Sequence, residues 1–391
     1  MTVVDRVAAP AEAPASAPRE RGEAAPGLER DGVLRTCSIG ALQLEAGGAL
    51  PEVELAYETW GTLNADASNA VLIQHALTGD THVAQGHADQ PGWWDSLVGP
   101  GKPVDTDRYF VVAANMIGGC YGSTGPASPD PDGLPWGSRF PFVTIRDSVR
   151  AEARLADRLG IRRWHAVVGG SMGGARALEW GLTYPHRVRH CVVVAIGAYS
   201  TAEQIALAQA QVLAIRQDPN YRDGDYYGAV PPNAGLGLAR RIAHISYRSE
   251  PEFSFRFGRR GQGAENPIEA SDGAATRGRY QVESYLDHQA DKLVRRFDAN
   301  SYVILTEALM SHDVGRGRGG AERALSAAGS EFFIASVTSD RLYFPEQSEQ
   351  LARWLPGEVP VYTIDAKIGH DGFLTEIGQL GPELRRRVFT L

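Results

Sequence analysis

The sequence predicts an α/β protein that combines a mostly parallel central sheet with an inserted helical subdomain. Three observations support this. From Thr36 onward, short runs rich in β-branched residues alternate with longer helical patterns. Between about residues 200 and 311 the strand patterns almost vanish and helical patterns dominate. Residues 1–30 are biased toward Ala, Pro and Glu, which is typical of a disordered tail. We therefore expect a core domain formed by residues 31–199 and 312–391, and a helical lid at 200–311.

Seven segments are predicted to be strands. The first alternates apolar and polar residues, and the others are nearly continuous apolar runs, as in strands that helices cover on both faces. They are residues 53–61, 70–76, 109–117, 164–170, 190–197, 331–337 and 359–365. Residues 144–160 carry apolar side chains at helical spacing before the terminal Gly160. The order strand, helix, strand is that of a parallel sheet.

The predicted insertion contains helical patterns at residues 202–218 and 280–298. Its middle, residues 254–280, is polar, rich in glycine and without periodicity, which predicts a mobile loop. The segment "DVGRGRGG" at 313–320 is expected to be the hinge that returns the chain to the sheet.

Composition argues against several classes of function. The 391 residues carry a net charge of −8 with acidic and basic residues interleaved, so no basic stripe is available for nucleic acid. Cys37, Cys120 and Cys191 are far apart and lack CxxC spacing, which suggests neither a disulfide framework nor a zinc site. No apolar run approaches the roughly 20 residues that span a bilayer. Because the N-terminus also lacks the pattern of a secretion signal, we expect a cytoplasmic protein without a membrane or metal partner.

Ser171 is the candidate nucleophile. It lies between Gly169 and Gly173 in a G-x-S-x-G pattern, with a predicted strand before it and a helical pattern after it. Such a sharp turn exposes a serine hydroxyl above the edge of a sheet, and the glycines are needed because side chains would clash there. A glycine-rich turn with an idle serine remains the alternative. A dinucleotide-binding turn is excluded, since its G-x-G-x-x-G pattern would need glycine at position 171.

A serine nucleophile needs a base to take its proton and an acid to orient that base. His370 is the predicted base because it follows the last predicted strand, in a loop with flanking glycines. Asp340 is the predicted acid, since it lies just beyond the preceding strand. Asp365 competes for this role, but it ends the same strand that leads to His370 and is poorly placed to orient the ring.

The charge of a tetrahedral intermediate also needs hydrogen-bond donors. The backbone N–H of Met172, directly after the nucleophile, is one expected donor. The N–H of Leu77, which follows the strand at 70–76, is the other. The glycine-rich loop at 115–126 lacks the Lys-Ser/Thr ending of a phosphate-binding loop, so we expect it to form a wall of the pocket.

Several segments together closely resemble the homoserine O-acetyltransferases, a family of α/β-hydrolase-fold enzymes of methionine biosynthesis. The resemblance runs from about residue 35 to the end and includes "HALTGD", "GGCYGSTGP", "GGSMGGARALEW", "SDRLYFP" and "GHDGF". It implies the α/β-hydrolase fold with a helical lid, acetyl-CoA and L-homoserine as substrates, and a homodimer. It implies no cofactor, since acetyl-CoA is a co-substrate. In the family the serine, aspartate and histidine that match Ser171, Asp340 and His370 form the catalytic triad.

The resemblance also implies substrate contacts. The arginine and tyrosine of the family's motif in "ARRIAHISY" match Arg240 and Tyr247, and the acidic residue after the triad histidine matches Asp371. A guanidinium can pair with the homoserine carboxylate and a carboxylate can hold its ammonium group. One departure is the pair Ala175-Arg176, where many members carry Met-Gln. We expect this departure to leave the chemistry intact, because the two residues lie on the helix that follows the turn at Ser171 and do not touch the triad.

These residues predict a ping-pong acetyl transfer through an acetyl-serine. Transfer of a succinyl group, or transfer to serine, is the nearest alternative. A succinyl donor would need a cation near the acyl terminus, for which Arg176 is the one open candidate. An esterase on the same fold is a more distant alternative, and a binding module without catalysis is opposed by the complete triad.

Overall fold

The computed structural model describes residues 31–87, 89–269 and 277–390. The predicted tail at 1–30 and residues 270–276 of the predicted loop lie outside this part of the chain. Among the described residues, the central sheet has eight strands in the order β1-β2-β6-β3-β7-β8-β9-β10. Their bounds are β1 Arg35–Gln43, β2 Ala49–Trp60, β3 Ala70–Gln74, β6 Phe110–Ala114, β7 Trp164–Gly170, β8 Val188–Val194, β9 Glu331–Val337 and β10 Val361–Ile364. The short strands β4 (Val98–Gly99) and β5 (Val104–Asp105) form a separate pair.

The sheet is mostly parallel, as predicted. β2 pairs antiparallel with both β1 and β6, and every pairing from β6 to β10 is parallel. The seven predicted strands are present with shifted ends. β1 was not predicted as a strand of its own, because its pairing with β2 is shifted on both sides of Gly40, which breaks the period-two pattern.

Helices cover both faces of the sheet. Leu72 of β3 packs with α1 (Ile145–Arg158) and α2 (Met172–Thr183) in one buried cluster. Its neighbours Val71 and Ile73 belong to a cluster on the opposite face with α11 (Ile377–Arg387). Burial on both faces explains the nearly continuous apolar runs. The remaining described helices of the core are α8 (Ala321–Ser326), α9 (Pro345–Trp354) and α10 (Gly372–Thr375). Short 3-10 turns lie at Gly137–Arg139 and Pro185–Arg187, and a third lies between α3 and α4 at Arg222–Gly224.

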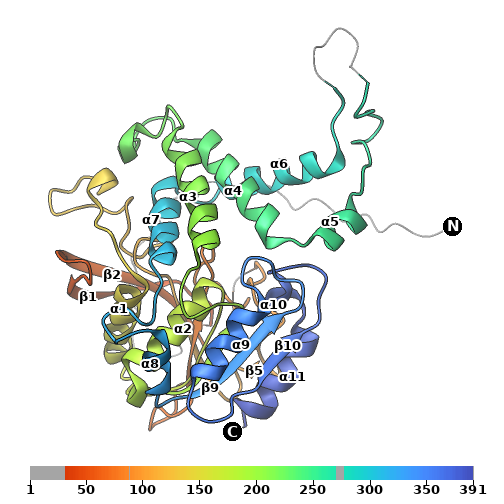
Figure 1. Ribbon diagram of the computed structural model, residues 1–391. Coiled ribbons are helices and arrows are strands. Elements are labelled where there is room, and N and C mark those ends of the chain that lie inside the picture. The colour runs from red at the N-terminus through yellow and green to blue at the C-terminus, as the bar shows by residue number, and fades with distance from the viewer. Residues whose placement is uncertain (1–30, 88, 270–276, 391) are drawn as a thin grey trace. The chain divides into compact units, whose positions relative to one another are not determined.

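The described segment between β8 and β9 begins with five helices. They are α3 (Ala202–Arg216), α4 (Asn233–Tyr247), α5 (Glu250–Arg256), α6 (Gln281–Val294) and α7 (Ala299–Met310). The helical patterns predicted at 202–218 and 280–298 correspond to α3 and α6, whereas α4, α5 and α7 were not predicted individually. α3 packs against α4 and α7, and α4 packs against α6 (Figure 1). The start of the predicted loop at 254–280 is helical, because Ser249 caps α5 and Pro251 stands in its first turn. The limits of the lid at 200 and 311 stay a prediction.

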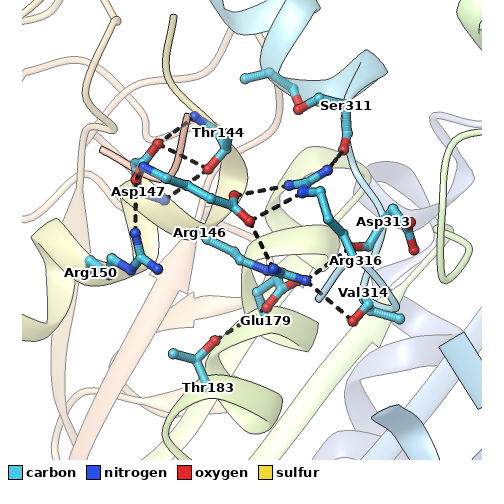
Figure 2. Close-up of polar contacts among 12 residues, drawn as sticks. Thr144, Arg146, Asp147, Arg150, Glu179, Thr183, Ser311, Asp313, Val314 and Arg316 are labelled. Carbon is cyan, nitrogen blue, oxygen red and sulfur yellow. Dashed lines mark hydrogen bonds and ion pairs between the residues drawn. The ribbon is translucent and has the colours of Figure 1, made fainter. Parts of the chain in front are cut away.

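A buried ion-pair network holds the segment that returns the chain from α7 to the core (Figure 2). Arg146 of α1 pairs with Glu179 of α2 at 3.1 Å and donates to the carbonyl of Asp313 at 3.1 Å. Arg318 pairs with the same carboxylate at 2.8 Å. The predicted hinge at 313–320 is therefore fastened to core helices α1 and α2.

No helix in the described part of the chain is long and apolar enough to cross a membrane.

Candidate active site

Ser171 occupies the turn between β7 and α2. Its backbone has φ 56° and ψ −129°, an unusual conformation for a residue with a side chain, and its N–H donates to the carbonyl of Val194 at 2.9 Å. A Cβ at Gly169 would lie 2.3 Å from the Gly173 backbone, and one at Gly173 would lie 2.2 Å from the Gln74 carbonyl oxygen. The glycines are therefore required by close backbone approach, which is the geometry of a nucleophile elbow.

His370 and Asp340 are hydrogen-bonded to each other. The two atoms are His370 Nδ1 and Asp340 Oδ2, 2.6 Å apart, and both side chains are buried. The other carboxylate oxygen accepts from the N–H groups of Leu342 and Tyr343, each at 2.9 Å. Burial lowers the pKa of His370, but the charge and hydrogen bond of Asp340, with the charge of Asp371, outweigh it and raise the pKa above its ordinary value. Asp365, the competing acid, instead accepts a hydrogen bond from Thr338 at 3.3 Å.

Ser171 and His370 lie on neighbouring segments that share one aromatic contact. A Cβ at Gly170 would lie 2.5 Å from ring carbons of Phe373, so that ring packs directly on the residue before the serine. The same ring meets the His370 ring edge to face, with centroids 5.5 Å apart. His370 Nε2 is buried and has no hydrogen-bond partner in the described part of the chain, and no hydrogen bond joins it to Ser171. The nitrogen that would accept the serine proton is thus available.

The two predicted oxyanion donors come from segments in contact. A Cβ at Gly173 would also lie 3.1 Å from the carbonyl oxygen of His75, so the start of α2 touches the chain just before Leu77. Within the described residues, neither the Leu77 N–H nor the Met172 N–H donates a backbone hydrogen bond outside regular elements. Leu77 also lines a cavity of about 50 Å³ together with Tyr343 of the core and Leu207 and Met310 of the insertion. The insertion therefore packs beside loops that carry predicted catalytic residues.

Arg240 and Tyr247 of α4 lie next to these loops. Arg240 Nη1 is 3.5 Å from Thr78 Oγ1, and its guanidinium lies 5.7 Å from the centre of the Tyr247 ring. The Tyr247 ring is 6.0 Å from the His370 ring, and burial raises the pKa of its hydroxyl. Among the described residues Arg240 forms no ion pair, and its buried Nε lacks a partner. A cation without a counterion near the predicted base suits an anionic group of a substrate.

Asp371 is brought to the site, but it is not free. Its Oδ2 pairs with Arg248 Nη2 at 3.2 Å, and Arg248 also lies 3.8 Å from Glu252. Close packing causes this contact: a Cβ at Gly369, whose φ is 95°, would lie 2.6 Å from the Tyr247 carbonyl oxygen. The end of α4 therefore rests on the histidine loop.

Sequence reasoning missed three neighbours of the base. They are Arg248, Tyr343, whose ring lies 5.4 Å from the His370 ring, and Phe373. Each stands within three residues of a predicted site residue, which was the signal available. Arg176 was considered as a cation for a succinyl donor, but it is fully buried and pairs with Glu152 at 2.8 Å.

Comparison with known proteins places this site in a family. The family model for the α/β hydrolase fold matches residues 69–376. A homoserine O-acetyltransferase from Thermobifida fusca is 57% identical over 345 residues, which cover 87% of this chain and 89% of the relative. The crystal structure of a homoserine O-acetyltransferase from Bacillus anthracis is 27% identical, covers 91% of this chain and 98% of its own, and has a TM-score of 0.84. An acetylester hydrolase from Corynebacterium glutamicum is 28% identical, covers 92% and 97%, and has a TM-score of 0.77.

The sheet order, the turn at Ser171 and the identity over nearly the whole chain lead to one conclusion: this protein belongs to the homoserine O-acetyltransferase family of the α/β-hydrolase fold.

Proposed function

We propose that this enzyme transfers the acetyl group of acetyl-CoA to the terminal hydroxyl of L-homoserine through an acetyl-Ser171 intermediate. The proposal rests on one observation: the site combines two features. A buried His370–Asp340 pair and the strained elbow at Ser171 belong to segments that both pack on Phe373. Arg240, without a counterion in the described residues, lies 3.5 Å from Thr78, the residue after Leu77. The first feature supports acyl transfer and the second supports an acceptor that carries a carboxylate.

The first half-reaction acylates the enzyme. His370 Nε2 takes the proton of the Ser171 hydroxyl as the oxygen attacks the thioester carbonyl carbon. The N–H groups of Leu77 and Met172 stabilise the negative oxygen of the tetrahedral intermediate. The carbon–sulfur bond then breaks, and His370 returns the proton to the departing sulfur, which gives free CoA and acetyl-Ser171. Asp340 holds the ring and stabilises its protonated form.

The second half-reaction follows the same path in reverse order. His370 takes the proton of the homoserine hydroxyl, and that oxygen attacks the acetyl carbon. The bond to Ser171 breaks, and His370 gives the proton back to the serine oxygen. Arg240 pairs with the homoserine carboxylate, and Asp371 holds its ammonium group through the oxygen that does not pair with Arg248.

Water is the competing acceptor, and the helical insertion opposes it. α3 and α7 pack beside Leu77 and Tyr343, with which they line a cavity of about 50 Å³, so the insertion covers part of the approach to these loops. Held in place by charged groups, homoserine reacts as if intramolecularly, whereas water gains no such orientation. Hydrolysis is the second candidate function, favoured by the fold shared with the acetylester hydrolase.

We also propose a cytoplasmic homodimer that meets through α3 and α4. Four exposed apolar side chains lie on these paired helices: Ile205, Leu213, Leu238 and Ile245. Exposed apolar side chains on a pair of packed helices favour association of two copies. Sedimentation at several protein concentrations, with Leu238→Lys as the disrupting variant, tests this.

One experiment tests the function. Purified protein receives acetyl-CoA or succinyl-CoA with homoserine or serine, and CoA release and product mass are followed. We expect O-acetylhomoserine from one combination, a mass gain of one acetyl group when acetyl-CoA is given alone, and neither with Ser171→Ala. Hydrolysis in all four combinations would reject the transferase. Arg240→Met should raise KM for homoserine with little change for acetyl-CoA.

A further inference from the structure

A buried polar cluster lies under the loop that carries the Leu77 N–H. Arg176 of α2 and Glu152 of α1 are both almost completely buried and pair at 2.8 Å. The other oxygen of Glu152 accepts from the side chains of Gln74 and Trp180, each at 2.7 Å. Arg176 Nη2 donates to the carbonyl oxygen of His75 at 2.8 Å. The cluster thus links two helices to the end of β3, two residues before Leu77.

The His75 ring continues this chain of contacts to the next peptide. The N–H of Met116 donates to His75 Nε2 at 3.3 Å, so Nε2 is an acceptor and the proton is on Nδ1. His75 Nδ1 then donates to the carbonyl oxygen of Ala76 at 2.8 Å, which also accepts from the Gly79 N–H at 2.9 Å.

Fixing the Ala76 carbonyl fixes the Leu77 N–H, because both belong to one planar peptide unit in which the oxygen and the hydrogen point in opposite directions. Two donors that hold the oxygen on one side therefore direct the N–H to the other. Burial, followed by the nearby charge of Arg176, lowers the pKa of His75 to about 3. The ring stays neutral and keeps the acceptor nitrogen that this arrangement needs.

We propose that Arg176, through the His75 carbonyl, and the neutral His75 ring, through the Ala76 carbonyl, are positioning residues that orient the Leu77 N–H as an oxyanion donor. The proposal rests on the proposed function only through the acylation of Ser171. The sequence led us to expect that residue 176 does not affect the chemistry, since Arg176 touches no member of the triad. The proposal replaces that expectation, because it gives the Arg176 side chain the role of supporting the loop that carries Leu77.

The cluster also explains why a charge is buried at this point. A guanidinium can bond a carboxylate and a carbonyl at once with a rigid geometry, which a lysine ammonium reproduces poorly. An uncharged pair would keep the packing but lose two charged hydrogen bonds of Arg176, the one to Glu152 and the one to the carbonyl oxygen of His75.

The test uses a charge-neutral double variant, Arg176→Gln with Glu152→Gln, so that no unpaired buried charge remains. A matched control is Glu179→Gln. Glu179 is a second buried glutamate, on α2, that also pairs with arginines, but its network holds residues 313 and 314 (Figure 2). Arg176→Lys is a second variant that keeps the charge and does not depend on the double variant folding.

Two readouts report on the oxyanion site. One is the single-turnover rate of Ser171 acetylation by acetyl-CoA, followed by intact mass. The other is the inhibition constant of methylboronic acid, whose tetrahedral adduct with Ser171 presents an oxygen to the Leu77 and Met172 N–H groups. Because removal of an oxyanion donor costs roughly 100- to 1,000-fold, misorientation of one should slow acetylation about 10- to 100-fold.

We expect the double variant to lose acetylation rate and boronate affinity by the same factor, with KM for acetyl-CoA unchanged and Arg176→Lys in between. Glu179→Gln should change neither readout. The proposal is overturned if the folded double variant has an inhibition constant for methylboronic acid within twofold of that of the parent protein. If the double variant does not fold, the same result for Arg176→Lys overturns it. Equal losses in Glu179→Gln would also overturn it. A parent enzyme that hydrolyses acetyl-CoA without transfer would reject the proposed function and leave this test intact, since both readouts precede the acceptor.

Discussion

The substitution Gly173→Ala tests the elbow directly. A Cβ at position 173 would lie 2.2 Å from the Gln74 carbonyl oxygen, whereas ordinary contacts begin near 3.4 Å. The backbones of α2 and β3 must therefore separate by roughly 1 Å, because the atom that blocks the methyl group is main chain. These two segments lead to the Met172 and Leu77 N–H groups. A misplacement of about 1 Å in catalytic geometry can cost about 100-fold in rate.

The assay is kcat for CoA release with acetyl-CoA and homoserine, together with folded fraction from near-ultraviolet circular dichroism. We expect a drop in kcat of about 100-fold per folded molecule. Gly378→Ala is the matched control: it lies on α11, where an added Cβ would meet nothing within 4 Å, so activity should be unchanged. If folded Gly173→Ala keeps kcat within threefold of the parent, the tight approach does not set the oxyanion geometry and the reasoning fails.

Three further predictions follow from the site and its network. The raised pKa of His370 keeps the base protonated up to a pH above the ordinary pKa of 6.5, so the acylation rate should fall as the pH drops through a value above 6.5. Asp371→Asn removes one charge that raises this pKa and should move the fall in acylation rate to lower pH. If the pH profile of acylation by acetyl-CoA does not move in this variant, the assignment is contradicted. Asp340→Asn should lower kcat by roughly 1,000- to 10,000-fold with a similar melting temperature, because the ring loses its orienting acceptor; a loss below tenfold would count against the dyad. Glu179→Gln should lower the free energy of unfolding in urea by about 1–3 kcal/mol, because it weakens two ion pairs of a buried carboxylate. An unchanged midpoint of urea unfolding would show that the network adds little stability.

Much of the fold was predictable because local patterns and global burial agree. The strands β3, β7 and β9 are apolar along their length because helices cover both faces, and the sequence shows this as continuous runs. β1 was missed since its irregular pairing at Gly40 breaks the alternation. The last three residues of helix α5, 254–256, were predicted as the start of a loop, because the seven residues of this helix are too few to show a helical period.

Some residues of the candidate site could also be predicted from the sequence, and others could not. Ser171, Asp340 and His370 could be named from chain order, because parallel strands bring their carboxyl ends to one edge of the sheet. Arg240, Tyr247 and Asp371 could be named only through a family resemblance. The pairing of Asp371 with Arg248 could not be foreseen, since it depends on how closely the end of α4 approaches Gly369.

The sequence alone determined the alternation of strands and helices, the elbow pattern and the order of the triad, because these follow from local spacing and from the rules of parallel sheets. Only the tertiary structure decided which buried charges meet. Arg176 lies five residues after the nucleophile, and nothing nearby along the chain points to its partners Glu152 and His75, or to Gln74, which bonds Glu152. Those partners come from two other elements, and only packing of α1 and α2 against β3 brings them within hydrogen-bond distance.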